Sequence, residues 1–236
     1  MKEIFGKISS EESLGLVDGP GIRYVVFLQG CKLRCIYCHN PETWDLNVHS
    51  YLITPQELIS KIERYIPYFG SNGGVTFSGG EPLLQPEFLL ECLKLCKEKN
   101  IHVVLDTAGV GFGEYEEILS LVDLVILDIK ATDNQSYKQI TGFEMTSFNK
   151  FLDDCQKHNK KMWLRQVIVP GINDTKESVE QLKQFALQLK GIEKIELLPY
   201  KNMGSIKYKS LKLKERLDGV PNMNEIACKN LEKLLN

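Results

Sequence analysis

Short apolar runs rich in valine, isoleucine and leucine alternate along this chain with longer amphipathic stretches. This alternation is typical of repeated βα units around a parallel sheet. The predicted strands are residues 23–28, 75–78, 102–107, 124–129, 162–169 and 194–198. The predicted helices are residues 55–65, 86–99, 115–121, 149–159, 176–189 and 224–235. A full barrel needs eight units and roughly 250 residues, so six units predict an α/β fold that is a partial (β/α)6 TIM-like barrel.

The chain has 236 residues and contains no Gly/Ser-rich linker or repeat. We therefore expect one domain over 1–236, with a barrel core at about 16–200 and a C-terminal extension over 201–236. The chain has 29 Lys and Arg residues and 31 Asp and Glu residues, and this nearly neutral charge gives no support for a nucleic-acid or membrane partner. The start lacks a secretory signal and no long apolar span occurs, which predicts a cytoplasmic protein. We also expect a monomer.

Side chains that suggest chemistry gather at the predicted carboxyl ends of the strands. They are Cys31, Cys35 and Cys38 after the first strand, Ser78 to Glu81 after the second, Asp106 and Thr107 at the third, Asp128 and Lys130 at the fourth, Arg165 in the fifth, and Leu198 to Tyr200 at the sixth. Parallel βα folds build their sites at this edge. One shared pocket is therefore predicted.

The three clustered cysteines have C-x3-C-x2-C spacing, with no fourth cysteine nearby. Cubane iron–sulfur clusters usually have four thiolate ligands, so three would leave one iron open for another ligand. A structural zinc site completed by His39 is one alternative, although adjacent Cys38 and His39 suit one small ion poorly. Buried, unliganded thiols are another. A disulfide framework is not expected, because the chain has seven cysteines and is large enough to fold without one.

Motifs along nearly the whole chain resemble those of radical S-adenosylmethionine (SAM) enzymes, and more narrowly of the family that activates pyruvate formate-lyase. They are residues 17–23, 30–31, 35–40, 43–45, 75–76, 78–81, 105–107, 128–130, 169–171 and 196–200. The resemblance implies a barrel of the radical SAM type. It also implies a [4Fe–4S] cluster on the three cysteines, with SAM on the fourth iron.

The family chemistry implied by this resemblance is radical transfer to a partner protein. One electron from the cluster cleaves SAM to methionine and a 5′-deoxyadenosyl radical, which abstracts a hydrogen from a glycine of the glycyl radical enzyme. The resemblance implies pyruvate formate-lyase as the partner and a donor such as flavodoxin or ferredoxin. No catalytic acid–base pair is required, because a hydrogen atom is transferred.

The resemblance also implies roles for individual residues. Those expected to contact SAM are Tyr37, His39, Gly79, Gly80, Glu81, Asp106, Asp128, Lys130 and Arg165. Those expected to hold a monovalent cation, Na⁺ or K⁺, are Asp106, Thr107, Ile126 through its carbonyl, and Asp128. Asp18 is expected near the glycine-bearing loop of the partner.

Structural alternatives stand beside these roles. Residues 78–82 also suit a plain strand-to-helix turn, and strand-end charges are often only solvated. Arg165, within an apolar strand, also suits an ion pair with a carboxylate. Asp18 also suits a turn before the first strand. Packing is expected for the remaining cysteines, which are Cys92, Cys96, Cys155 and Cys228.

Two features bear on the choice of partner. No cysteine occurs between Cys38 and Gly79, so the ferredoxin-like insertion of other activators is absent, which favours the pyruvate formate-lyase type. Lys201 stands where this family commonly has histidine, and we assign it no catalytic role. The alternatives are an activator of another glycyl radical enzyme, a radical SAM enzyme acting on a small molecule, and a zinc-stabilised binding module.

Overall fold

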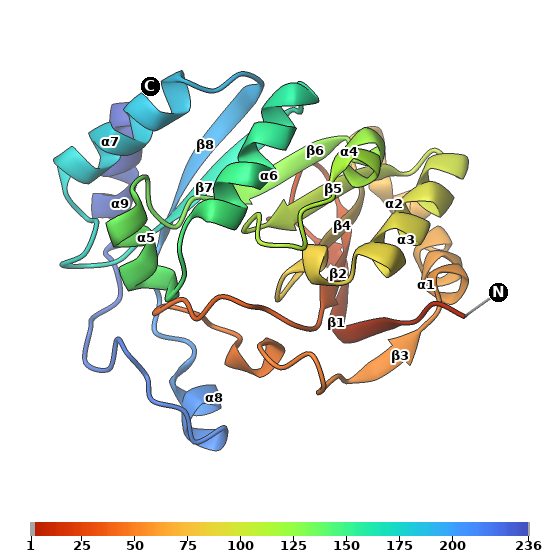
Figure 1. Ribbon diagram of the computed structural model, residues 1–236, viewed down its shortest axis with the longest axis horizontal. Helices are drawn as coiled ribbons and strands as arrows, with labels where there is room; N and C mark the ends of the chain where they lie inside the picture. The colour runs from red at the N-terminus through yellow and green to blue at the C-terminus, as the bar shows by residue number, and fades with distance from the viewer. Residues whose placement is uncertain (1–2, 236) are drawn as a thin grey trace.

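A single mixed sheet organises the computed structural model, which describes residues 3–235, so both ends of the predicted 1–236 domain lie outside the described residues. Its strands are β1 (Gly6–Gly15), β2 (Arg23–Leu28), β3 (Tyr51–Ile53), β4 (Gly74–Gly79), β5 (His102–Thr107), β6 (Leu124–Asp128), β7 (Met162–Ile168) and β8 (Ile192–Pro199). Their order in the sheet is β3-β1-β2-β4-β5-β6-β7-β8 (Figure 1). Strands β2 and β4 to β8 are parallel neighbours, while β1 runs antiparallel to β2 and β3.

The six parallel strands are the six predicted from sequence, so the partial (β/α)6 barrel is confirmed. Strands β1 and β3 were not predicted. The middle of β1 is polar, with Glu11 and Glu12 paired opposite Val26 and Val25, and β3 is only three residues long. Neither segment carries the apolar run by which a buried strand is recognised.

Most of the helices lie between consecutive strands and cover one face of the sheet, and two helices follow the last strand (Figure 1). They are α1 (Pro55–Glu63), α2 (Ile66–Phe69), α3 (Pro86–Glu98), α4 (Glu116–Leu121), α5 (Asn134–Thr141), α6 (Thr146–Lys157), α7 (Lys176–Leu187), α8 (Ser205–Ser210) and α9 (Glu225–Glu232), with short 3-10 turns η1 (Pro41–Thr43), η2 (Pro82–Leu84) and η3 (Lys233–Leu235). The predicted last helix packs at the end of the sheet, where the Leu197 N–H of β8 donates to Glu232 at 3.0 Å. Among residues 3–235 no helix is long and apolar enough to cross a membrane.

Alternate residues of the central strands face opposite sides of the sheet, as the two-residue period of a strand requires. Val103 and Leu105 belong to the main core beneath the helices. Val104 and Ile126 belong to a separate small cluster, against which Trp163 packs. The second cluster marks the inner face of the partial barrel. Residues two positions further along the same strands therefore face the same inner space.

Candidate radical SAM site

Polar side chains follow the inner apolar cluster at the carboxyl edge of the sheet. Ser78, Asp106 and Asp128 lie at or next to the last residues of β4, β5 and β6, and strand alternation places them on the inner face. The Ser78 hydroxyl donates to Asp106 at 2.7 Å. The parallel register sets Arg165 beside Asp128 and Glu196 beside Arg165. One edge therefore collects charges that lie far apart in the sequence.

A cavity of about 220 Å³ opens at this edge. The predicted residues that line it are Cys31, Cys35, Tyr37, Cys38, His39, Gly79, Gly80, Asp106, Thr107, Asp128 and Lys130. Glu81, Arg165, Ile126 and Asp18 are not part of the lining. The shared pocket expected from sequence is thus present, with four of the predicted residues placed behind or beside it.

The loop that carries the three cysteines is held by backbone hydrogen bonds on two sides. The Cys31 N–H donates to the carbonyl of Trp44 at 3.3 Å, and the Ile36 N–H donates to the carbonyl of Ile140, in α5, at 2.9 Å. The three thiols are free. Burial raises the pKa of all three, and that of Cys35 to about 11. Without metal, these side chains are therefore protonated at neutral pH.

The donors near the three thiols bear on the choice between the two metal centres considered above. Among residues 3–235, no three His, Cys, Asp or Glu side chains converge closely enough to hold one metal ion. Tetrahedral zinc requires such convergence, with ligands about 2.0–2.3 Å from the ion. In a [4Fe–4S] cluster each thiolate binds a different iron, so its ligands stand further apart. Three free thiols are the ligand number that leaves one iron of a [4Fe–4S] cluster open, whereas the described residues form no convergent zinc set.

Two glycines after β4 allow the chain to turn closely against its neighbours. Gly79 has φ +115, and a Cβ there would lie 2.3 Å from the backbone nitrogen of Leu28. A Cβ on Gly80 would lie 2.3 Å from the carbonyl oxygen of Gly30. Both glycines also line the cavity. Glycine is nevertheless required at both positions first of all by close backbone packing, which any larger residue would disrupt.

Glu81 is fully buried and is engaged by the end of β5. Its carboxylate accepts hydrogen bonds from the Thr107 hydroxyl at 2.5 Å, the Ala108 N–H at 3.0 Å and the Leu83 N–H at 3.1 Å. A longer bond of 3.4 Å comes from the Val110 N–H. Burial raises the pKa of Glu81, and these hydrogen bonds oppose the rise. In this arrangement Glu81 joins the loops after β4 and β5, and its contact with SAM stays a prediction.

Lys130 is a buried ammonium group in the cavity wall. It pairs with Asp128 at 2.6 Å, and its Nζ lies 5.5 Å from the centre of the Tyr37 ring. Burial alone would lower the pKa of Lys130, but Asp128 raises it well above the usual value. Burial, followed by repulsion from Asp128, raises the pKa of Asp106. The edge thus combines one fixed cation with two closely placed carboxyl groups.

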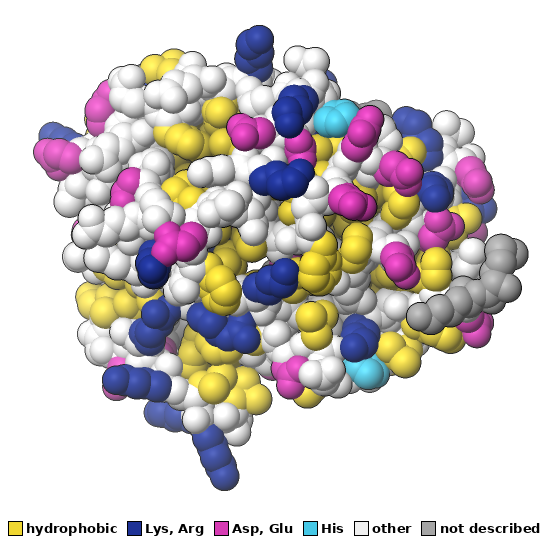
Figure 2. All heavy atoms as spheres, viewed as in Figure 1, with side chains coloured by type: hydrophobic (Ala, Val, Ile, Leu, Met, Phe, Trp, Pro, Cys, Tyr) yellow, Lys and Arg dark blue, Asp and Glu magenta, His cyan; other side chains and the backbone are white. Residues whose placement is uncertain are grey.

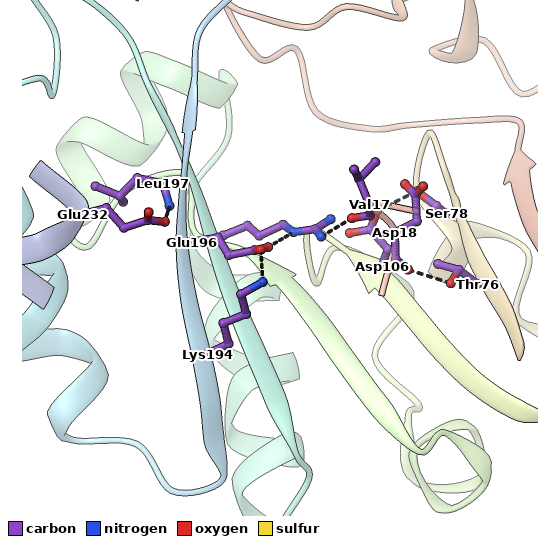
Figure 3. A network of polar contacts seen from close by, with 10 residues as sticks. Val17, Asp18, Thr76, Ser78, Asp106, Lys194, Glu196, Leu197 and Glu232 are labelled. Carbon is purple, nitrogen blue, oxygen red and sulfur yellow. Dashed lines mark hydrogen bonds and ion pairs between the residues drawn. The ribbon is translucent and has the colours of Figure 1, made fainter. Parts of the chain in front are cut away.

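Arg165 crosses the inner space from β7 to the segment before β2. Its Nε donates to Glu196 at 2.7 Å, and a second N–H donates to the carbonyl oxygen of Val17. Lys194 also pairs with Glu196, and the carbonyl of Asp18 accepts from the Thr76 hydroxyl at 2.7 Å (Figure 3). The ion pair considered as the structural alternative for Arg165 is therefore present. Its proximity to SAM stays a prediction.

The comparisons with known proteins agree with this site. The model of the radical SAM superfamily matches residues 25–186. The chain is 52% identical over 233 residues to a pyruvate formate-lyase-activating enzyme of Clostridium pasteurianum, covering 98% of both chains. It is 41% identical over 239 residues to one of Staphylococcus epidermidis, covering 98% of this chain and 95% of the relative. The chain belongs to the pyruvate formate-lyase-activating enzyme family of the radical SAM superfamily.

A solved structure supports the fold of this family member. A domain of a pyruvate-formate lyase-activating enzyme from Bacteroides vulgatus aligns with a TM-score of 0.55 and 24% identity, covering 69% of this chain and 92% of that one. Radical SAM enzymes use SAM and an iron–sulfur cluster, so these two predicted cofactors follow from membership of the superfamily.

Sequence reasoning left two parts of the site of this radical SAM protein unassigned. Glu196 holds Arg165, and the polar residues Lys194 and Glu196 at alternate positions of β8 were the available signal. Trp44 lines the cavity, and its ring meets Tyr208 edge-on at 5.9 Å. Lys201 is absent from the lining, and its ammonium pairs with Glu225 at 2.8 Å.

Proposed function

We propose that this protein uses a [4Fe–4S] cluster and SAM to produce a glycyl radical on pyruvate formate-lyase. The observation that carries the proposal is the meeting of three free thiols, Gly79, Gly80 and the Asp128–Lys130 pair at one cavity. The relatives that cover 98% of this chain and are named for this activation support the choice of partner.

The residues of the chain bind and orient the reacting groups. Cys31, Cys35 and Cys38 would hold the cluster, and their thiols would give up protons to do so. When bound, the cluster and SAM supply the one-electron chemistry that removes a hydrogen atom from a glycine Cα. Lys130, kept charged by Asp128, would bind the SAM carboxylate. No proton transfer by a side chain is needed for this step.

The other predicted residues would surround SAM and the partner. Tyr37 and His39 line the cavity beside the cysteines and would lie near the adenine. We place Asp106 at the methionyl part of SAM and Arg165 beside it, and Glu81 at the SAM amino group. Asp18, half-buried in the segment that Arg165 contacts, would meet the glycine loop of the partner. Closely placed reacting atoms account for much of the rate in such a site.

We also propose a monovalent cation, Na⁺ or K⁺, held by Asp106, Thr107, the carbonyl of Ile126, and Asp128. Asp106 and Asp128 repel each other, and a hard cation bound to their oxygen atoms would offset that repulsion.

The seven free thiols suit a reducing compartment, which supports the cytoplasm. We propose a monomer with one domain over 1–236 and an extension over 201–236. Flavodoxin or ferredoxin would supply electrons.

The decisive experiment is electron paramagnetic resonance of pyruvate formate-lyase mixed anaerobically with SAM and the reduced, cluster-loaded protein. We expect a glycyl doublet. Cys31→Ala is expected to lose the cluster and the doublet, whereas the matched Cys92→Ala, buried in the helix core, keeps both. If the doublet forms only on a different glycyl radical enzyme, that enzyme is the partner instead of pyruvate formate-lyase. SAM cleavage stimulated by a metabolite alone would favour a small-molecule substrate.

A further inference from the structure

Exposed basic side chains gather on the cysteine loop and on residues 209–216, which contact that loop through Arg216. We propose that this basic surface docks an acidic carrier protein that passes single electrons to the cluster, an inference that rests on the proposed function. The basic surface is defined by six exposed side chains, which are Lys32, Arg34, Lys209, Lys212, Lys214 and Arg216. In the electron-transfer step the carrier loses one electron and the oxidised cluster gains it, and no bond forms or breaks.

The charge of the basic surface is local. The whole chain has a formal net charge of −2, whereas residues 201–219 contain six basic side chains and only two acidic ones, Glu215 and Asp218. Two of the six, Lys201 and Lys207, pair with Glu225 and Glu42, so the local positive charge rests on the four that belong to the basic surface. The positive potential is thus concentrated at one place, where it attracts an acidic protein and speeds its association.

The basic surface includes part of the cysteine loop and a later segment that contacts this loop. Lys32 and Arg34 stand between Cys31 and Cys35 in the same loop. The His39 ring is hydrogen-bonded to the carbonyl of Lys201 at 2.6 Å. The guanidinium of Arg216 donates to the carbonyl oxygens of Arg34 and Ile140, the latter at 3.2 Å. Electron transfer weakens steeply with distance, so a carrier bound here approaches the cluster from its own loop.

Apolar side chains lie among these charges. Ile206 is 82% exposed and Met203 is 62% exposed, and Leu211 and Leu213 are also exposed. Figure 2 shows hydrophobic side chains with Lys and Arg around them at the lower left, where Figure 1 places α8. A small apolar patch within a charged rim suits a transient protein complex, which binds weakly and releases its partner after transfer.

A membrane is a poorer occupant for this surface. Helix α8 has six residues, too short for the long amphipathic helix that lies in a membrane interface. Electron supply, in contrast, requires access at the cysteine loop itself. The position of the charge therefore favours an acidic electron carrier.

The test reverses charge on the basic surface without touching the cavity. The variant is Lys209→Glu, Lys212→Glu and Lys214→Glu, three exposed residues outside the cavity lining. Stopped-flow absorbance follows reduction of the cluster by a purified, reduced acidic ferredoxin, and by photoreduced deazaflavin, which needs no docking. We expect reduction by ferredoxin to slow about ten-fold at low salt and to lose its salt dependence. Reduction by deazaflavin stays unchanged.

A matched control makes the same change in net charge elsewhere. It is Lys97→Glu, Lys176→Glu and Lys190→Glu, which are exposed residues on α3, on α7 and before β8. This control is expected to keep the wild-type rate with ferredoxin. Equal slowing in both triple variants, or slowing with deazaflavin, would overturn the proposal. So would unchanged reduction by ferredoxin in a variant that loses binding to phosphatidylglycerol vesicles, since that result assigns the surface to lipid.

The same variants separate this inference from the proposed function. Binding of oxidised ferredoxin to the cluster-free protein, measured by calorimetry, is expected to weaken about ten-fold in the first variant and not in the control. Neither this measurement nor cluster reduction uses SAM or a glycyl radical enzyme. A failed glycyl assay with intact, charge-dependent docking would therefore reject only the partner enzyme.

Discussion

Glu81 is the residue whose buried hydrogen bonds most directly hold the loop after β4. Replacing it by alanine leaves the Thr107 hydroxyl and the N–H groups of Leu83 and Ala108 without their acceptor. We expect Glu81→Ala to lower the free energy of unfolding by about 3 kcal/mol, because unpaired buried donors are costly. Urea denaturation of the cluster-free protein measures this change. Glu98→Ala, at an exposed position, serves as the control. A similar loss of unfolding free energy in both variants would contradict the structural role of Glu81.

The residues of the site could be predicted where a local sequence pattern marks them, but contacts between distant segments could not. The three cysteines, Asp106 and Asp128 were predicted to gather at the carboxyl ends of the strands, and the structure brings them to one cavity. The Glu81 bonds to the loop after β5 and the Val17 carbonyl at Arg165 were not, because each joins segments far apart in sequence. Such contacts depend on how the sheet closes, which no local pattern encodes.

At the scale of elements, the Arg165–Glu196 pair ties β7 to β8 and, through Val17, to the segment before β2. Burial alone would raise the pKa of Glu196, but Lys194 and Arg165 hold it below the usual value. A carboxyl with a depressed folded pKa stabilises the fold above its unfolded pKa, about 4.3. That contribution is lost as the pH falls through the folded value.

We therefore expect Glu196→Gln to cost about 1–2 kcal/mol of unfolding free energy at neutral pH, since the pair is only partly buried. The difference from wild type should shrink as the pH falls below about 4.3 and vanish in stronger acid. Urea denaturation at a series of pH values measures it. Glu193→Gln, on the same strand, removes an exposed pair with Lys161 and should cost less than about 0.5 kcal/mol. A difference independent of pH would reject the ion-pair explanation.

Elements with strong apolar periodicity were predicted, and weakly patterned ones were missed. Helices α3 and α7 follow their predicted ranges closely. Helix α5 was missed because its sequence is polar around Tyr137 and Ile140, although Asp133 caps its start and Gly142, at φ 81, ends it. Tertiary packing of those two buried side chains stabilises a helix that its composition alone does not indicate.

At the scale of the whole molecule, residues 201–216, which follow the last strand, pack on the cysteine loop, which follows β2. Trp44 meets Tyr208, His39 bonds to the Lys201 carbonyl, and Arg216 donates to the Arg34 carbonyl. This return of the chain was not predicted, because 201–216 carries neither a strand run nor a long helical pattern. Because of this packing, the conformation of residues 201–216 depends on the conformation of the loop that carries the three cysteines.

Loading of the cluster should therefore protect two separate segments from hydrogen exchange. Cluster binding favours the conformation in which the three cysteines are fixed, and local opening of that loop becomes rarer. Because residues 201–216 pack on the loop, we expect slower amide exchange there as well as in 31–44, with α3 unchanged as the internal control. Anaerobic exchange with mass spectrometry, comparing cluster-free and loaded protein, measures this. Protection confined to 31–44 would show that the C-terminal segment moves independently of the site.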